Sequence, residues 1–220
     1  MLNKEKSKGS LMTAMQIKHL SMLHLSDTHS LHRQLTKLPD ADMIVHSGDF
    51  TMAGTEQEVF DFINWFCDLP YRHKIFIAGN HDDCLYGAEL SGLDDNCHYL
   101  CNSGINIEGR KFYGVPMFIG DDMSGKYKEY LSDIPNDTDV LITHQPPLCV
   151  LDYDGHRHYG SPGLFEKIQI VRPRLHLFGH IHAAFGTSLS NGTIFSNAAL
   201  VDEQYYFVQG RIAALPIFRL

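Results

Sequence analysis

The sequence has no hydrophobic run that approaches the roughly 18–20 residues needed for a membrane-spanning helix. We therefore expect a chain that does not enter a membrane. The sequence also has no internal repeat and no low-complexity linker, which favours a single domain. The opening stretch reads MLNKEKSKGSLMTAMQ and has basic residues but no apolar segment after them, unlike a secretory signal peptide. We therefore predict a flexible tail over residues 1–14, a single domain over residues 15–220 and a cytoplasmic location.

Cysteine pairs and positive charge are scarce as well. The five cysteines are odd in number, widely spread and without a C-x-x-C pair, which favours reduced thiols over a disulfide framework. The 18 Lys and Arg residues are outnumbered by 26 Asp and Glu residues, for a net charge of −8. This balance argues against duplex nucleic acid as a partner. It does not exclude a small phosphate compound, because a bound metal can override the overall field.

Short apolar runs alternate with helical patterns, which predicts an α/β fold. A helix is expected over 55–70, where Thr55 and Glu58 can form a capping box, and another over 161–173, which Ser161 can cap. Strands are expected over 19–25, 42–49, 74–82, 109–118, 139–147, 174–178, 192–200 and 204–218.

Metal-type ligands follow five of these apolar runs directly. They are Asp27 and His29 in LSDTHS, Asp49 in HSGDF, Asn80 and His81 in AGNHDD, His144 in ITHQPP, and His180 and His182 in FGHIH. In open α/β sheets, ligands bind at the carboxyl ends of the strands. A single H-x-H pair is weak evidence, but five such turns after five strands indicate one shared metal site.

The ordered motifs D-x-H, G-D, G-N-H-D, H and G-H-x-H resemble the calcineurin-like metallophosphoesterase superfamily. Stretches such as GDFTMAG, ITHQPPL and PRLHLFGHIHAAFG are similar to its subgroup of metallophosphoesterase domain-containing proteins, which is like the class III cyclic-nucleotide phosphodiesterases. The resemblance spans residues 27–182, and no core motif residue is missing. It implies a two-sheet β-sandwich flanked by helices, in four layers α/β/β/α.

The resemblance also implies two divalent metal ions. One would be bound by Asp27, His29, Asp49 and His182, and the other by Asp49, Asn80, His144 and His180, so that Asp49 bridges them. Two metals held close together need a shared anionic ligand to reduce their repulsion. Each ligand set mixes imidazole with oxygen donors and contains no cysteine. Mn, Fe, Zn, Co or Ni therefore fits better than Mg alone.

These assignments lead to the prediction of a phosphodiesterase, in which a hydroxide bridging the two metals attacks phosphorus. The resemblance gives His81 the role of the acid that protonates the leaving group. Asp82 would either orient the His81 ring or cap a turn. A nucleotide-like or other small phosphodiester is the expected substrate, and the oligomeric state stays open.

The segment DYDGHRHYGSPG, residues 152–163, follows the His144 strand and is long enough to overhang the site. Tyr153, His156, Arg157 and Tyr159, together with Asn80 and His81, are the expected substrate contacts. The loop would equally serve to cover a sheet end. Two other functions are weighed: a phosphomonoesterase or nuclease, and a nucleotide-binding regulatory protein with slow turnover.

Overall fold

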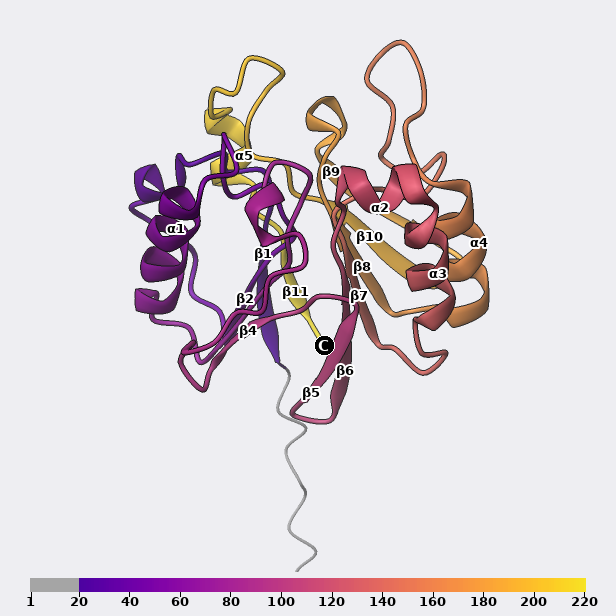
Figure 1. Cartoon of the computed structure of the whole chain (residues 1–220), viewed down its shortest axis with the longest axis horizontal. Helices are drawn as coiled ribbons and strands as arrows, with labels where there is room; N and C mark the ends of the chain where they lie inside the picture. Colours follow the sequence, from indigo (N-terminus) through magenta and orange to yellow (C-terminus); the bar gives the residue numbers. More distant parts are fainter. Residues whose placement is uncertain (1–19) are drawn as a thin grey trace, which may run out of the picture.

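The computed structural model describes residues 20–220. The tail predicted over residues 1–14 lies outside them. Two mixed sheets face each other at the centre of the molecule, and helices cover both outer sides (Figure 1). This confirms the expected α/β sandwich. Within residues 20–220, no helix is both long and apolar enough to cross a membrane.

The first sheet has five strands in the order β11-β1-β2-β3-β4. Their bounds are β1 Ser21–Leu25, β2 Met43–His46, β3 His73–Phe76, β4 Cys97–Tyr99 and β11 Ile217–Arg219. Strands β1 to β4 are parallel, and β11 pairs antiparallel with β1. Leu23 on β1 lies opposite Ile44 on β2. The helix α1, Glu56–Asp68, covers the outer face of this sheet.

The second sheet has six strands in the order β5-β6-β7-β8-β10-β9. The strands are β5 Ser103–Ile107, β6 Arg110–Val115, β7 Val140–Thr143, β8 Leu175–Phe178, β9 Gly186–Ser190 and β10 Thr193–Asn197. Its central four strands are parallel, and both edge strands are antiparallel. The helices on its outer side are α2 Ile119–Ser124, α3 Lys126–Asp133 and α4 Pro162–Val171.

Both helices expected from the sequence are confirmed, and each starts at the expected cap. In α1 the hydroxyl of Thr55 accepts a hydrogen bond from the Glu58 amide at 3.3 Å, and the Glu58 carboxylate accepts one from the Thr55 amide at 3.1 Å. In α4 the hydroxyl of Ser161 accepts from the Leu164 amide at 3.2 Å. These caps satisfy amides that the first turn of a helix leaves without partners.

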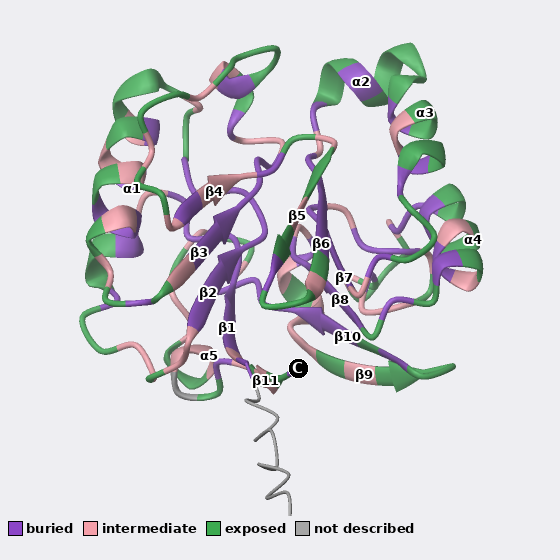
Figure 2. Ribbon diagram, turned by 90° about the horizontal axis from the view of Figure 1, so that it is seen from below, coloured by how far each residue is buried: buried purple, intermediate pink, exposed green. Residues whose placement is uncertain are grey.

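The core is built in layers, which Figure 2 shows as buried strands between more exposed helices. Met22, Val45, Ile75 and Leu177 pack between the two sheets and are fully buried. Separate apolar clusters fill the space under α1 and under the helices of the second sheet. None of the five cysteines forms a disulfide. Hydrophobic burial and the hydrogen bonds between strands therefore hold the centre together without a disulfide, and they fix where each strand ends.

One prediction was wrong. Residues 204–218 were expected to form a strand, but they form a turn, the short helix α5 at Gln209–Ala213 and the short strand β11. Asp202 ends the extended chain: its side chain accepts hydrogen bonds from the amides of Gln204 and Tyr206, both at 3.0 Å. Local caps of this kind compete with strand formation, and the apolar residues in the segment concealed them.

The sheets are joined at the edge where the parallel strands end. Just past β1, the amide of Ser26 donates to Ala198 at 3.1 Å and its carbonyl accepts from Leu200 at 3.1 Å. This bridge closes the gap between the carboxyl ends of the two sheets. The turns that follow β1, β2, β3, β7 and β8 therefore meet in one place.

Candidate metal centre

The five turns bring predicted ligands together at this edge, where their side chains form two groups. In one group the ligand atoms of Asp27, His29 and His182 all lie within 4.8 Å of one another, and in the other those of Asp49, His144 and His180 do. Each group draws on both sheets, so neither can form before the sheets pack against each other.

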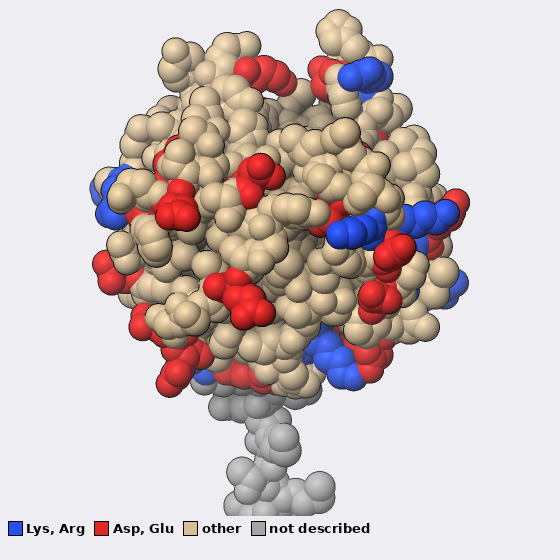
Figure 3. Space-filling model, viewed as in Figure 1, with Lys and Arg blue, Asp and Glu red and all other residues tan. Residues whose placement is uncertain are grey.

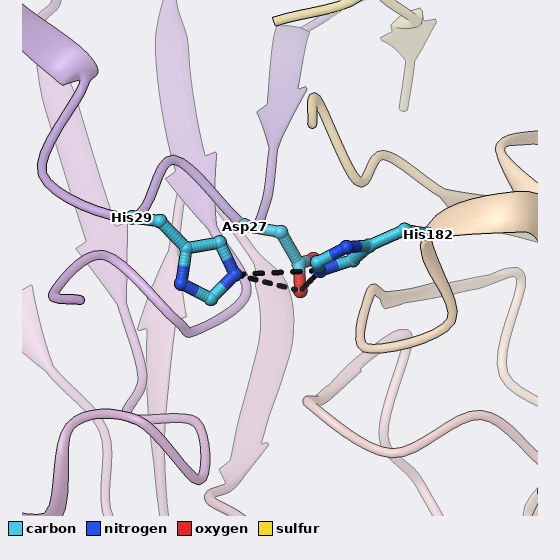
Figure 4. Close-up of side chains that lie close together, drawn as sticks. All are labelled: Asp27, His29 and His182. Atoms are coloured by element: carbon cyan, nitrogen blue, oxygen red, sulfur yellow. Dashed lines mark hydrogen bonds and ion pairs between the residues drawn. The ribbon is translucent and has the colours of Figure 1, made fainter. Parts of the chain in front are cut away.

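The first group is shown in Figure 4, where the rings of His29 and His182 flank the carboxylate of Asp27. Nε2 of His182 lies 3.3 Å from Oδ1 of Asp27, and Nε2 of His29 lies 4.0 Å from the same oxygen. The two Nε2 atoms are 3.3 Å apart. All three side chains therefore aim at one small volume.

Asp49 lies between the two groups. Its Oδ2 atom is 3.1 Å from Nε2 of His144 in the second group and 3.9 Å from Nε2 of His29 in the first. The rings of His144 and His180 meet edge to face at 5.1 Å between centroids. Asp49 thus belongs to the second group and also faces His29 of the first.

Backbone carbonyls set the protonation of three of these histidines. Nδ1 of His29 lies 3.1 Å from the carbonyl of Thr51, Nδ1 of His144 lies 2.9 Å from that of Ser47, and Nδ1 of His182 lies 2.9 Å from that of Asp202. A carbonyl only accepts, so Nδ1 must carry the proton. In the neutral ring Nε2 then keeps its lone pair, which is how metal-binding histidines are oriented.

The donor set fits divalent metal ions by two observations. The Nε2 atoms of His29 and His182 face each other at 3.3 Å beside the carboxylate of Asp27, an arrangement that needs a shared cation or proton between them. In addition, Oδ1 of Asn80 is buried and has no hydrogen-bond partner within residues 20–220. A buried amide oxygen without a partner is costly, and a metal ion would satisfy it.

The ionisation of the site also suits a cation. Burial opposes the charge on Asp49, but the neighbouring His144 outweighs it and lowers the pKa of Asp49 to about 2. Burial lowers the pKa values of His29 and His180 to about 4, against the pull of nearby carboxylates. Burial also opposes a charge on His144 and His182, but Asp49 raises the pKa of His144 to about 9 and Asp27 raises that of His182, so a metal ion would displace a proton from each of these two rings.

Four of the seven ligands have a backbone conformation that is uncommon for residues with side chains. The φ angles are 53° at Asp27, 40° at His29, 55° at Asp49 and 70° at His180. Such conformations cost free energy and persist where the surrounding structure enforces them, often at functional sites. Here they turn each side chain off its strand and into the gap between the sheets.

Two glycines make room for the carboxylates. A methyl group at Gly179 would collide with Oδ2 of Asp27, and one at Gly79 would collide with Oδ1 of Asp49. We predict that Gly179→Ala and Gly79→Ala each lower the metal content of the purified protein while the fold remains. Metal analysis with circular dichroism tests this, with Gly210→Ala as the control because no atom lies within 4 Å of its added methyl. Parent-like metal content in both variants would contradict it.

His81 lines the cavity next to these ligands. Its backbone amide donates to Oδ1 of Asp49 at 2.8 Å, and its Nδ1 lies 2.9 Å from the carbonyl of Met52. The carbonyl fixes Nδ1 as a donor, so Nε2 is the nitrogen left to face a substrate. The role of His81 as a proton donor to the leaving group stays a prediction, and it requires both ring nitrogens to be protonated.

Asp82 is not placed to orient the His81 ring, so the catalytic assignment of Asp82 is corrected. Its buried carboxylate accepts from the amides of Gly79 and Asp49, both at 2.8 Å, and from the amide and hydroxyl of Thr51, at 2.9 and 2.8 Å. It ties the turns after β2 and β3 together. Asp82 thus holds Asp49 in place, which is the turn-capping alternative.

The loop residues predicted to contact a substrate divide into two kinds. Tyr159 lines the cavity, whereas the exposed side chains of Tyr153, His156 and Arg157 lie outside its lining. The hydroxyl of Tyr153 donates to Gly155 in its own loop at 2.9 Å. The guanidinium of Arg157 stacks on the ring of Tyr159, 4.3 Å from its centroid. The loop therefore offers one wall to the cavity.

Sequence analysis missed the opposite wall. Glu203 and Tyr205 line the same cavity of about 320 Å³; Tyr205 belongs to the segment 204–218 that was predicted to be a strand, and Glu203 directly precedes it. No motif surrounds them in DEQYYF. The one local signal was Asp202, whose capping side chain reverses the chain and brings Tyr205 over the histidines.

Comparison with known proteins agrees with the fold and the motifs. The family model for calcineurin-like phosphoesterases matches residues 20–184. A UPF0046 protein of Caenorhabditis elegans is 35% identical over 210 residues, which cover 82% of this chain and 75% of that one. Metallophosphoesterase domain-containing protein 1 of Homo sapiens is 34% identical over 216 residues, covering 82% of this chain and 66% of the human one.

Solved structures show the same fold at lower identity. One has a TM-score of 0.57 at 14% identity and covers 81% of this chain and 90% of its own. GAP50, the anchor in the inner membrane complex of Plasmodium, has a TM-score of 0.51 at 16% identity and covers 83% of this chain and 72% of its own. Taken with the family match and the clustered ligands, these findings place the chain in the calcineurin-like phosphoesterase family, whose members are metal-dependent hydrolases of phosphoric esters.

Proposed function

We propose that the protein is a phosphodiesterase with two divalent metal ions, and that it hydrolyses a small phosphodiester of the nucleotide type. The observation that carries this proposal is the position of Asp49, whose Oδ2 lies between His29 of one ligand group and His144 of the other. A single carboxylate shared by two adjoining donor sets supports a pair of metals, as two-metal phosphoesterases require.

The charge around the centre favours a diester. Two divalent ions would bring four positive charges, of which the carboxylates of Asp27 and Asp49 offset two and a hydroxide held by the ions would offset a third, which leaves an excess of one. The cavity lining contains no Lys or Arg within residues 20–220, but it does contain the carboxylates of Asp154 and Glu203. A diester has one negative charge and a monoester close to two. The small positive excess therefore suits the diester, and a monoester lacks the fixed cation that would meet its second charge.

The protein's own side chains have separate tasks. When bound, the metal ions would polarise the phosphate and make water acidic enough to supply a nucleophile near neutral pH. Asp49 would hold the two ions at a fixed spacing, and Asn80 offers a buried oxygen beside them. In its doubly protonated form, His81 would donate the Nε2 proton to the departing alkoxide and become neutral, while its Nδ1–H stays bonded to the carbonyl of Met52.

The proposal predicts a substrate preference. With the same metals bound, bis-nitrophenyl phosphate and nucleotide diesters should have a higher kcat/KM than nitrophenyl monophosphate and the matching nucleoside monophosphates. Steady-state kinetics on the metal-loaded protein measures this. A higher kcat/KM for the monoester would favour a phosphomonoesterase instead. A tightly bound nucleotide with no measurable turnover of either class would favour a regulatory binding protein.

A further inference from the structure

Two projections stand on either side of the metal centre. The first is the loop at residues 152–160, and the second is the turn at residues 201–207, which we call the 201–207 hairpin because Val201 and Phe207 form an antiparallel bridge. Both rise from the same end of the sandwich, one over each sheet (Figure 1). Figure 3 shows acidic side chains on both projections, a basic side chain on the loop at residues 152–160, and a hollow between the projections.

The 201–207 hairpin is fastened to the metal centre. The carbonyl of Asp202 accepts from Nδ1 of His182 at 2.9 Å and from the amide of Tyr205 at 3.0 Å. At its base, the guanidinium of Arg211 donates to the carbonyls of Ala199 and Val201. The hairpin and the ligand His182 are therefore one rigid unit, and the place of Tyr205 is set by the same carbonyl that orients His182.

Tyr205 is held over three histidines. Its ring centroid lies 4.7 Å from that of His29, 5.6 Å from that of His182 and 5.8 Å from that of His81, all in edge-to-face contact. Its φ angle is 62°, which a bulky residue rarely adopts. The ring covers the Asp27 side of the centre and stands next to His81, on the side where the leaving group must depart.

We propose that Tyr205 and Glu203 form the subsite for the leaving alcohol. They select an alcohol that bears an aromatic ring and no additional negative charge, such as a nucleoside. Tyr205 supplies a flat apolar wall on which a nucleobase can stack, and Tyr159 supplies the facing wall. Glu203 and Asp154 line the same cavity, and the lining has no Lys or Arg within residues 20–220, so a leaving group with a further phosphate is repelled. This inference rests on the proposed phosphodiesterase activity.

Two diesters of thymidine 3′-phosphate test the aromatic wall. One is esterified with methanol and the other with the 5′-hydroxyl of a second thymidine, so both release a primary alcohol, and chromatography counts only that release. Tyr205→Ala should lower kcat/KM for the dinucleoside by about 10-fold more than for the methyl ester, the order expected for loss of one stacking contact. Tyr205→Phe should behave like the parent.

Tyr206→Ala is the matched control, because Tyr206 is the neighbouring residue, is 70% exposed and lies outside the cavity lining. An equal fall on both diesters, or a loss of metal in Tyr205→Ala, would overturn the proposal and leave Tyr205 with a purely structural role. If the parent cleaves neither of these diesters nor bis-nitrophenyl phosphate, the phosphodiesterase proposal itself fails, which is a different result.

The charge of the subsite is tested with a third diester, whose leaving thymidine has a phosphate on its 3′-hydroxyl. The parent should cleave it more slowly than the first dinucleoside, whose leaving thymidine has no charge. The measured ratio is kcat/KM for the dinucleoside without the added phosphate divided by kcat/KM for the diester that has it. Glu203→Gln should reduce this ratio by about 3-fold, as expected for one exposed charge at short range. Glu129→Gln, an exposed residue on α3, should not change the ratio. An unchanged ratio in Glu203→Gln would refute the role of Glu203.

Discussion

Replacing Asp49 with Asn should lower kcat/KM for bis-nitrophenyl phosphate by about 10³-fold and reduce the bound metal. The amide keeps the size of the side chain but removes the charge that faces both His29 and His144. Without that charge, two neighbouring cations repel each other more strongly, and both donor sets lose a ligand. Steady-state kinetics and elemental analysis on the same preparation measure the two effects together.

Asp133→Asn is the control for this change, because Asp133 is an exposed carboxylate at the end of α3. It should match the parent in activity and metal content. The account of Asp49 as a shared ligand would be wrong if Asp49→Asn bound the same amount of metal and stayed within a few-fold of parent activity.

Replacing His81 with Ala should lower kcat/KM by about 10²–10⁴-fold for diesters that release a basic alkoxide. The loss should be much smaller for bis-nitrophenyl phosphate, because nitrophenolate leaves without being protonated. The physical basis is that His81 lines the cavity while its Nδ1 is bound to the carbonyl of Met52. The measurement is kcat/KM for the alkoxide-releasing diester divided by kcat/KM for bis-nitrophenyl phosphate, compared between the variant and the parent.

His156→Ala serves as the matched control, since His156 is exposed and lies outside the cavity lining. Its ratio should equal that of the parent. An equal fall on both ester types in His81→Ala would exclude proton donation and assign His81 to phosphate binding or to holding Asp49, to which its amide donates.

The metal centre was accessible from sequence because each part of it is a local pattern. An apolar run that ends in Asp27, Asp49 or His144 indicates a strand end, and parallel strands place their carboxyl ends on one edge. The cap at Thr55 was equally local, since residues three apart define it. Such patterns predict structure well because the residues that define the pattern and the residues that it positions belong to the same short segment.

The remaining parts depend on long-range contacts that no short pattern records. One of the two roles expected for Asp82 was to orient the ring of its sequence neighbour His81, but its partners include Asp49 and Thr51, more than 30 residues away. Tyr205 reaches the site only because the hairpin is bonded to His182 across the molecule. The edge strands β5 and β9 have exposed, weakly patterned residues, so they gave no strand signal.

The most direct test of the account is a metal titration of the native chain. Protein treated with a chelator should be inactive on bis-nitrophenyl phosphate, and added Mn²⁺ or Zn²⁺ should restore activity as close to two ions bind per chain, measured by equilibrium dialysis and elemental analysis. Full activity in the metal-free sample, or complete recovery with a single bound ion, would contradict a centre in which Asp49 is shared by two metals.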